Sequence, residues 1–291
     1  MKHKHELAVL LAACGWGLIG LFTRRLGALG LGSGDILLVR ACGCALFFAA
    51  ALALRGLSGF AVRPRDLPLL TAFGLTTLFF TYCYYRSIAL ASMSVACTLM
   101  FTAPVFVMIM SLFVFHERFS RQKLISLFLA LGGVALVSGL VSGGAAFSAL
   151  GALFGLLSGL GYALYNIFSK LLSQRGYTVW QINFYGWFIC AVFCALIWGF
   201  RGAAPAVADG AGRWLCFWMV LISGFTPALL YNWALGSMEA SRASMMGTLE
   251  PVVATVAGAA AFHESISPAG FAGIALVLAA VAVLNIKRRK A

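Results

Sequence analysis

One acidic residue lies deep inside an apolar stretch of the chain. Glu250 is followed directly by Pro251, near the middle of an apolar run long enough to cross a bilayer. A carboxylate at that depth costs roughly 2.5–3.5 kcal/mol, so such residues usually serve a function. Pro251 leaves the carbonyl of Gly247 without its helical donor. The two features together predict a site for a proton, a cation or a substrate amine. The alternative is a protonated acid that pins neighbouring helices.

Arg40 is the second charged residue placed within an apolar run, in this case near one end of it. At this position a guanidinium can bind an anion or a carboxylate, or it can pair with an acid. The alternative is that the long side chain extends to the lipid headgroups, helped by the nearby Asp35. The residue types alone leave both interpretations open.

Aromatic and amide side chains also occur at depth, where their polar groups need partners. Tyr82 and Tyr85 are three residues apart and share one helical face. A polar substrate cavity would satisfy such groups, whereas residues nearer the membrane surface fit an interfacial aromatic belt. The expected cavity residues, besides Glu250 and Arg40, are Trp16, Tyr82, Tyr85, Tyr162, Asn166, Tyr231 and Asn232.

The composition identifies the solvent in which this chain folds. It is 62% hydrophobic and 10% charged, with a mean hydropathy of +0.98. Soluble domains carry about 25% charged residues, so the apolar runs predict membrane-spanning helices. The eight cysteines all fall in apolar runs and are expected to be free thiols. We find no catalytic carboxylate pair, phosphate loop or metal-ligand spacing, so we expect neither an enzyme nor a bound cofactor or metal.

The apolar runs predict ten spans, with boundaries uncertain by a few residues. Each is about 20 residues long, whereas barrel strands would be about 10 residues long and alternating. The spans cover roughly 7–27, 35–54, 67–87, 92–114, 122–140, 149–171, 179–200, 214–235, 241–262 and 267–286.

The basic residues predict the orientation of these spans. With the N-terminus inside, fifteen of the 21 lysines and arginines fall on the inner side. This bias places both termini in the cytoplasm. Because loop arginines and lysines also contact anionic lipid, the net charge of +13 does not point to a nucleic acid. The start of the chain looks cytoplasmic, without a cleavable signal pattern.

The chain repeats itself by halves. A proline, Pro104 or Pro251, precedes a Phe-His-Glu sequence ending at Glu117 or Glu264, with the same 13-residue spacing from proline to glutamate. Each half, residues 1–145 and 146–291, holds five spans, so the second half enters the membrane from the opposite side. The predicted fold is therefore an all-α polytopic membrane protein with ten transmembrane helices in two inverted five-helix repeats. Inverted repeats are typical of transporters that bind their substrate between the halves.

Two five-helix repeats, each ending in Pro-x12-Glu, together with Leu249-Glu250-Pro251-Val252, resemble the EamA branch of the drug/metabolite transporter superfamily. The resemblance covers essentially the whole chain. It implies a central cavity, export of amino acids or other small metabolites, and transport that is proton-coupled or facilitative. It also favours a functional role for Arg40, because this residue resembles an arginine that is common in the second helix of that family. We interpret Glu117 and Glu264 as structural groups at helix ends.

The expected function is thus a secondary transporter in the cytoplasmic membrane, an exporter of amino acids or similar metabolites. Alternating access would use Pro104 and Pro251 as hinges, and Glu250 would bind a proton or an amine. Its partners would be a small-molecule substrate, the lipid bilayer and, if coupled, protons; ten helices can enclose a cavity in a monomer. Two alternatives remain: a carrier of sugar phosphates, drugs or other organic solutes, and a membrane enzyme or lipid-handling protein.

Overall fold

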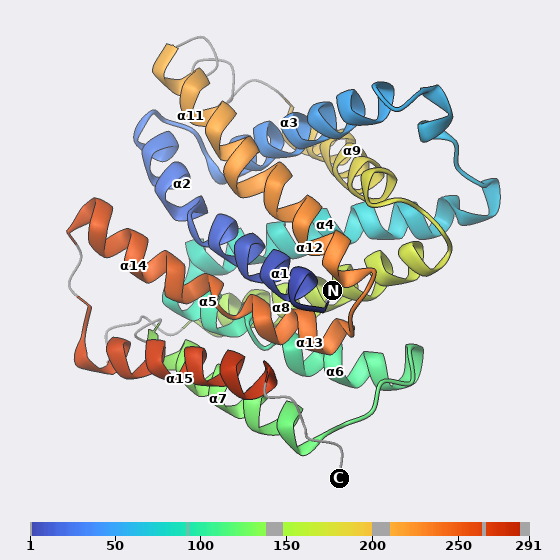
Figure 1. The fold of residues 1–291 in the computed structure, drawn as a ribbon. Helices are drawn as coiled ribbons and strands as arrows, with labels where there is room; N and C mark the ends of the chain where they lie inside the picture. The colour runs from blue at the N-terminus through green and yellow to red at the C-terminus, as the bar shows by residue number, and fades with distance from the viewer. Residues whose placement is uncertain (1, 92, 138–147, 200–209, 264–265, 286–291) are drawn as a thin grey trace.

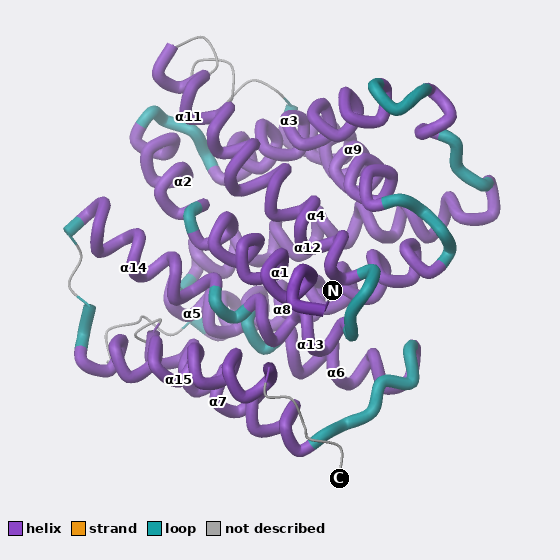
Figure 2. The backbone as a smooth tube through the Cα atoms, in the orientation of Figure 1, coloured by secondary structure: helices purple, strands orange, loops and turns teal. Residues whose placement is uncertain are grey.

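The computed structural model describes residues 2–91, 93–137, 148–199, 210–263 and 266–285, in which every regular element is helical (Figure 2). The elements are α1 (Lys2–Gly17), α2 (Ile19–Ala28), α3 (Ser33–Ala53), η1 (Leu57–Phe60), η2 (Pro64–Asp66), α4 (Leu67–Leu90), α5 (Met93–Met100), α6 (Ala103–Val114), α7 (Arg121–Val137), α8 (Ala149–Gln174), α9 (Val179–Trp198), α11 (Gly210–Val220), η4 (Leu221–Phe225), α12 (Thr226–Leu235), α13 (Ala240–Gly247), α14 (Glu250–Phe262) and α15 (Pro268–Asn285).

These helices form the predicted polytopic bundle. Eight segments of the described chain are long and apolar enough to cross a membrane, and Pro268–Leu284 is a shorter apolar helix. With α7, they supply the ten predicted spans. An even number of spans leaves both termini on one side; that this side is the cytoplasm stays a prediction. The predicted boundary between the halves, after residue 145, lies outside the described residues.

Three of the predicted spans are interrupted. The fourth is divided into α5 and α6, and the ninth into α13 and α14, with Pro104 and Pro251 each in the first turn of the second piece. Proline suits the first turn of a helix, where its missing N–H has no helical acceptor. The first span is also divided, at Leu18, which the sequence did not predict.

The backbone confirms the inverted repeat. Among described residues other than glycine, only His116 and His263 have positive φ, at 54° and 56°, and they follow α6 and α14 respectively. The repeat extends to side chains: the Lys170 ammonium lies 4.8 Å from the centre of the Phe115 ring, and the Arg24 guanidinium lies 4.9 Å from that of Phe262. The equivalent helices α6 and α14 therefore end with the same backbone conformation and with the same kind of cation–ring contact.

Small residues allow the helices to approach closely. A Cβ on Gly155 would lie 2.8 Å from Leu99, and one on Gly159 would lie 2.9 Å from the Leu99 carbonyl, so these glycines of α8 pack on α5. Likewise, a Cβ on Gly273 of α15 would lie 2.7 Å from the carbonyl of Gly133 on α7. These two helices lie together at one edge of the bundle (Figure 1).

The connections gather at two opposite ends of the bundle. The α2–α3 turn and the end of α14 lie at the left of Figure 1, and the α3–α4 and α6–α7 connections lie at the right. With the predicted orientation, the left is the outer side of the membrane and the right is the cytoplasmic side.

Candidate functional site

A cavity of about 420 Å³ lies between the two repeats and opens at the α2–α3 end. Exposed residues such as Gly27 and Ser33 line its mouth. Trp16, Tyr162 and Glu250 line its inner part. Because α1, α2, α3, α4, α8 and α14 all contribute, both repeats form its wall.

Glu250 is the first residue of α14, directly after the break in its span. It is half-buried and lines the cavity, and its carboxylate has no hydrogen-bond partner among the described residues. Gly17 at the end of α1 allows the close approach, because a Cβ there would lie 2.8 Å from the Glu250 carbonyl oxygen. The acid is thus presented at the break of a discontinuous helix, where transporters commonly bind ions and substrates.

Arg40 of α3 lines the same cavity and is 8% exposed. Its Nη2 donates to the carbonyl of Ser223 at 2.7 Å, and its guanidinium lies 5.3 Å from the centre of the Trp187 ring. Asp35 instead accepts a hydrogen bond from the backbone N–H of Gly32. The arginine therefore points into the cavity wall, and the alternative in which it extends to the headgroups does not describe this structure.

Aromatic rings form most of the remaining wall. Trp16 contacts Tyr162 edge-on with ring centres 6.3 Å apart, and Tyr85 lies further along the cavity. The hydroxyls of Tyr85 and Tyr162 are buried and make no hydrogen bond within the part of the chain that the structure describes. The cavity also includes residues that the sequence did not single out, because uniformly apolar helices give no sign of which face points inward: Thr77, Phe80, Thr81, Tyr84, Tyr165 and Trp187.

Three of the expected cavity residues belong to two adjoining sets of buried hydrogen bonds, which we together call the polar floor (Asn166, Ser169, Asn183, Tyr231 and Asn232). The Tyr231 hydroxyl donates to Asn166, and Ser169 donates to Asn232 at 2.8 Å. Asn232 in turn donates to Asn183 at 2.7 Å and to the Tyr165 hydroxyl at 2.8 Å. Since Tyr165 lines the cavity, the polar floor lies directly beside it.

Tyr82 lies outside the main cavity. Its side chain is 38% exposed, and its ring centre lies 5.7 Å from that of Trp198. With Arg86 it lines a smaller pocket of about 240 Å³. Tyr85 borders both spaces, so only one of the two tyrosines predicted to share a face reaches the main cavity.

The opposite end of the molecule is closed by a cluster around Glu117, which we call the Glu117 cluster (Glu117, Lys123, Lys170, Ala240 and Ser241). Glu117 accepts hydrogen bonds from the Ala240 N–H at 2.7 Å, from Lys170 at 2.9 Å and from the Ser241 hydroxyl. Burial favours the neutral acid, but the bonds from Ser241 and Lys170 outweigh it, so the pKa of Glu117 lies below its ordinary value.

Glu117 thus joins the first repeat to the start of α13 in the second, in the structural role that the sequence predicted. It acts as an acceptor for the first N–H groups of that helix. Glu264, the equivalent residue of the second repeat, lies outside the described residues.

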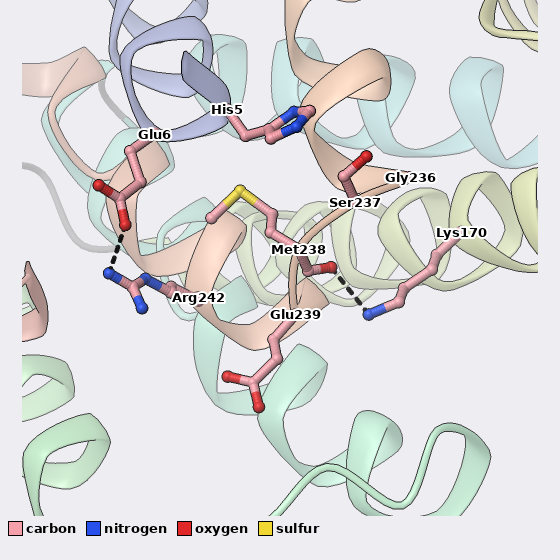
Figure 3. A pocket seen from close by; sticks show the side chains of 8 residues that line it. All are labelled: His5, Glu6, Lys170, Gly236, Ser237, Met238, Glu239 and Arg242. Atoms are coloured by element: carbon pink, nitrogen blue, oxygen red, sulfur yellow. Dashed lines mark hydrogen bonds and ion pairs between the residues drawn. The ribbon is translucent and has the colours of Figure 1, made fainter. Parts of the chain in front are cut away.

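Beside this cluster lies a pocket of about 580 Å³. Figure 3 shows Lys170 donating to the carbonyl of Met238, and Arg242 pairing with Glu6. The pocket thus lies where α1, α8 and the start of α13 meet. The polar floor, the Glu117 cluster and the Glu6–Arg242 pair are all at the end of the molecule opposite the mouth of the cavity.

Comparisons with known proteins agree with this architecture. The model of the EamA-like transporter family matches residues 3–139 and 149–286. An uncharacterized transporter of Synechocystis, sll1319, is 30% identical over 78% of this chain and 70% of its own length. Another from Archaeoglobus fulgidus is 27% identical over 96% of this chain and 95% of its own.

One solved crystal structure superposes on this chain with a TM-score of 0.82. It covers 98% of this chain and 97% of its own, at 16% sequence identity. At that identity the likeness shows a shared fold.

Proposed function

This chain belongs to the EamA-like transporter family, and from that premise we propose that it carries amino acids or similar small metabolites across the cytoplasmic membrane. One observation supports this proposal above the others. A single acid, Glu250, and a single buried arginine, Arg40, line one cavity between the two repeats, and the carboxylate has no hydrogen-bond partner in the described chain.

An α-amino acid matches these two charges. Glu250 suits the ammonium group, and Arg40 suits the carboxylate. The volume of about 420 Å³ is within the usual range for small-molecule sites, and the aromatic wall suits an apolar body. Tyr162 adds, at the inner end, a buried hydroxyl that makes no hydrogen bond to the residues described.

We propose alternating access as the mechanism. Pro104 and Pro251 each follow a break in a span, so the pieces on either side can tilt separately. Opening of the cytoplasmic end would require the polar floor and the Glu117 cluster to separate. With the predicted orientation, the cavity described here faces outward, and an exporter would release its solute from this state.

Glu250 also suits proton coupling, because one carboxylate can bind either a proton or the amine. Binding of a proton from outside would then compete with rebinding of the solute. This competition would drive net export.

The test is uptake into proteoliposomes of a pooled set of labelled amino acids and metabolites, with and without a pH gradient. The wild type is compared with Glu250→Gln, and with Glu239→Gln as a matched change at an exposed acid outside the cavity. We expect gradient-driven uptake that Glu250→Gln abolishes and Glu239→Gln retains.

Other outcomes separate the parts of the proposal. Uptake that ignores the gradient but still needs Glu250 would leave a facilitative carrier with an amine site. Uptake and pH dependence that Glu250→Gln leaves intact would overturn the role of this residue. No uptake of any solute in the pool would overturn the proposed substrate class.

A further inference from the structure

The eighth predicted span contains a turn of π-helix, η4 (Leu221–Phe225), between α11 and α12. A π turn accommodates an extra residue and disturbs the regular carbonyl ladder, and such turns are frequent at functional sites. The carbonyl of Ser223, within this turn, accepts the 2.7 Å hydrogen bond from Arg40. The turn thus connects the second repeat to the buried arginine of the first.

With Cys44 opposite, a glycine after Ser223 leaves room for this contact. A Cβ on Gly224 would lie 2.5 Å from the Sγ of Cys44, and 3.6 Å and 3.7 Å from the Cγ and Nε of Arg40. Only the contact with Cys44 is closer than van der Waals distance allows. Gly224 therefore lets η4 approach α3 closely enough to hold Arg40.

Held in this way, Arg40 retains an unused donor. Its Nε is buried and makes no hydrogen bond in the described chain, and the Tyr85 hydroxyl, which faces the Arg40 side chain, makes none either. Both residues line the cavity. Buried donors without partners are rare, so each needs an explanation, and beside a cavity a ligand can supply the missing acceptor. The Trp187 ring, 5.3 Å from the guanidinium, restricts its movement from one side.

We propose that the solute carboxylate binds the Nε of Arg40 and the hydroxyl of Tyr85, and that the Ser223–Gly224 π turn positions Arg40 for this contact. The inference rests on the proposed role of the cavity as a solute site. Tyr85 is then a specificity-determining residue that favours a carboxylate over the neutral amide of the same body. Ser223 and Gly224 are positioning residues that act through Arg40.

The positioning role is tested with Gly224→Ala, Cys44→Ala and the double variant. Because Cys44 Sγ is the one atom that the new methyl group would overlap, Cys44→Ala should relieve the clash. The first readout needs no solute: the rate at which phenylglyoxal modifies Arg40, followed by mass spectrometry. We expect at least a fivefold increase in Gly224→Ala and a return to within twofold of wild type in the double variant.

The carboxylate site is tested with L-leucine and L-leucinamide as probes, through the thermal shift of detergent-solubilised protein and through KM in proteoliposomes. Tyr85→Phe should reduce the preference for leucine over leucinamide about tenfold with little change in maximal rate. Tyr82→Phe, outside the main cavity, should leave the preference unchanged. Gly224→Ala should raise the KM for leucine at least tenfold, and Cys44→Ala should restore it.

The outcomes distinguish this inference from the proposed function. Failure of Cys44→Ala to reverse the effect of Gly224→Ala on Arg40 modification would overturn the positioning role, whether or not transport occurs. A preserved leucine preference in Tyr85→Phe would overturn the role of Tyr85. The wild type could bind and carry neither probe while the phenylglyoxal rates change as expected. The positioning role would then stand, and both the carboxylate site and the proposed substrate class would be overturned.

Discussion

The inverted repeat places equivalent residues at opposite ends of the molecule, and the two ends differ. Thr23 and Arg24 of the first repeat line the open cavity. Phe22-Thr23-Arg24 aligns with Phe168-Ser169-Lys170 of the second repeat. There Ser169 is 1% exposed in the polar floor, and Lys170 is paired with Glu117. The same structural position therefore faces the open cavity in the first repeat and is closed by hydrogen bonds in the second.

The open and closed ends also differ at the equivalent residues Gly20 and Asn166. Gly20 lines the open cavity, whereas its counterpart Asn166 is fully buried and bonded to Tyr231 and to the carbonyl of Tyr162. The closed end thus depends on directional polar contacts. Since hydrogen bonds in a buried network are lost together when two helices separate, opening of that end should be a discrete step.

The largest effect is expected at Glu117. Glu117→Gln removes a buried charge that holds Lys170 and the first N–H groups of α13. Loss of one partner of a buried ion pair costs about 3–5 kcal/mol, so the variant should unfold at a markedly lower temperature in detergent. Glu239→Gln is the matched control: Glu239 also pairs with Lys123, but its side chain is 49% exposed, and about 1 kcal/mol or less is expected. Equal losses in the two variants would contradict the special role of Glu117.

The same substitution predicts a pH dependence. Because the pKa of folded Glu117 lies below its ordinary value, its stabilisation is fully present above the unfolded pKa and is lost as the pH falls through the folded one. The stability gap between wild type and Glu117→Gln should therefore be largest at neutral pH and should narrow in the acid range. Thermal unfolding of both proteins across that range tests this. A stability gap that widens in acid would contradict a lowered pKa for folded Glu117.

Glu250 and Arg40 stand out in the sequence because ionisable residues are rare in a membrane, and the two prolines stand out because they recur at the same place in each half. In the structure Glu250, Arg40, Trp16, Tyr85 and Tyr162 lie around one cavity, and their roles there remain predictions. The break at Leu18 has no proline beside it and was not foreseen. The π turn at Leu221–Phe225 was not foreseen either, although Pro227 follows it in the first turn of α12 and cannot donate to the carbonyl of Ser223. The wall residues Thr77 and Thr81 were missed too. Lipid and protein interior are equally apolar, so hydropathy does not tell which face of a span points inward.

The partners of Asn166 and Asn232 could not be predicted for another reason. Apart from the Tyr162 carbonyl, which lies on the same helix as Asn166, these partners come from helices that are distant in sequence, as Ser169 is from Asn232. Depth alone indicated that these amides need partners. It did not indicate that Asn166 would bond to Tyr231, and Asn232 to Ser169 and Asn183, beside the cavity instead of facing a solute.

An intermediate effect is expected in the polar floor. Asn232→Leu leaves Ser169, Tyr165 and Asn183 without the amide that they share. Unpaired buried polar groups cost about 1–3 kcal/mol each, and the loss acts on the closed end alone. Thermal unfolding should show the destabilisation, and solute exchange in proteoliposomes should change with it. A change in stability below about 0.5 kcal/mol would mean that the network contributes little to closure.

The smallest effect is the most direct comparison of the two ends. Ser169→Ala removes one donor from Asn232 at the closed end, so about 1 kcal/mol should be lost. Thr23→Ala removes the equivalent hydroxyl at the open end, where it donates only to the nearby carbonyl of Gly20 at 3.2 Å. A half-buried hydroxyl with a local bond should change stability by about 0.5 kcal/mol or less. Thermal unfolding of both variants in the same detergent decides the matter. Equal losses would show that the two ends are held alike, and the hydrogen bonds of the polar floor would then not explain why one end is closed.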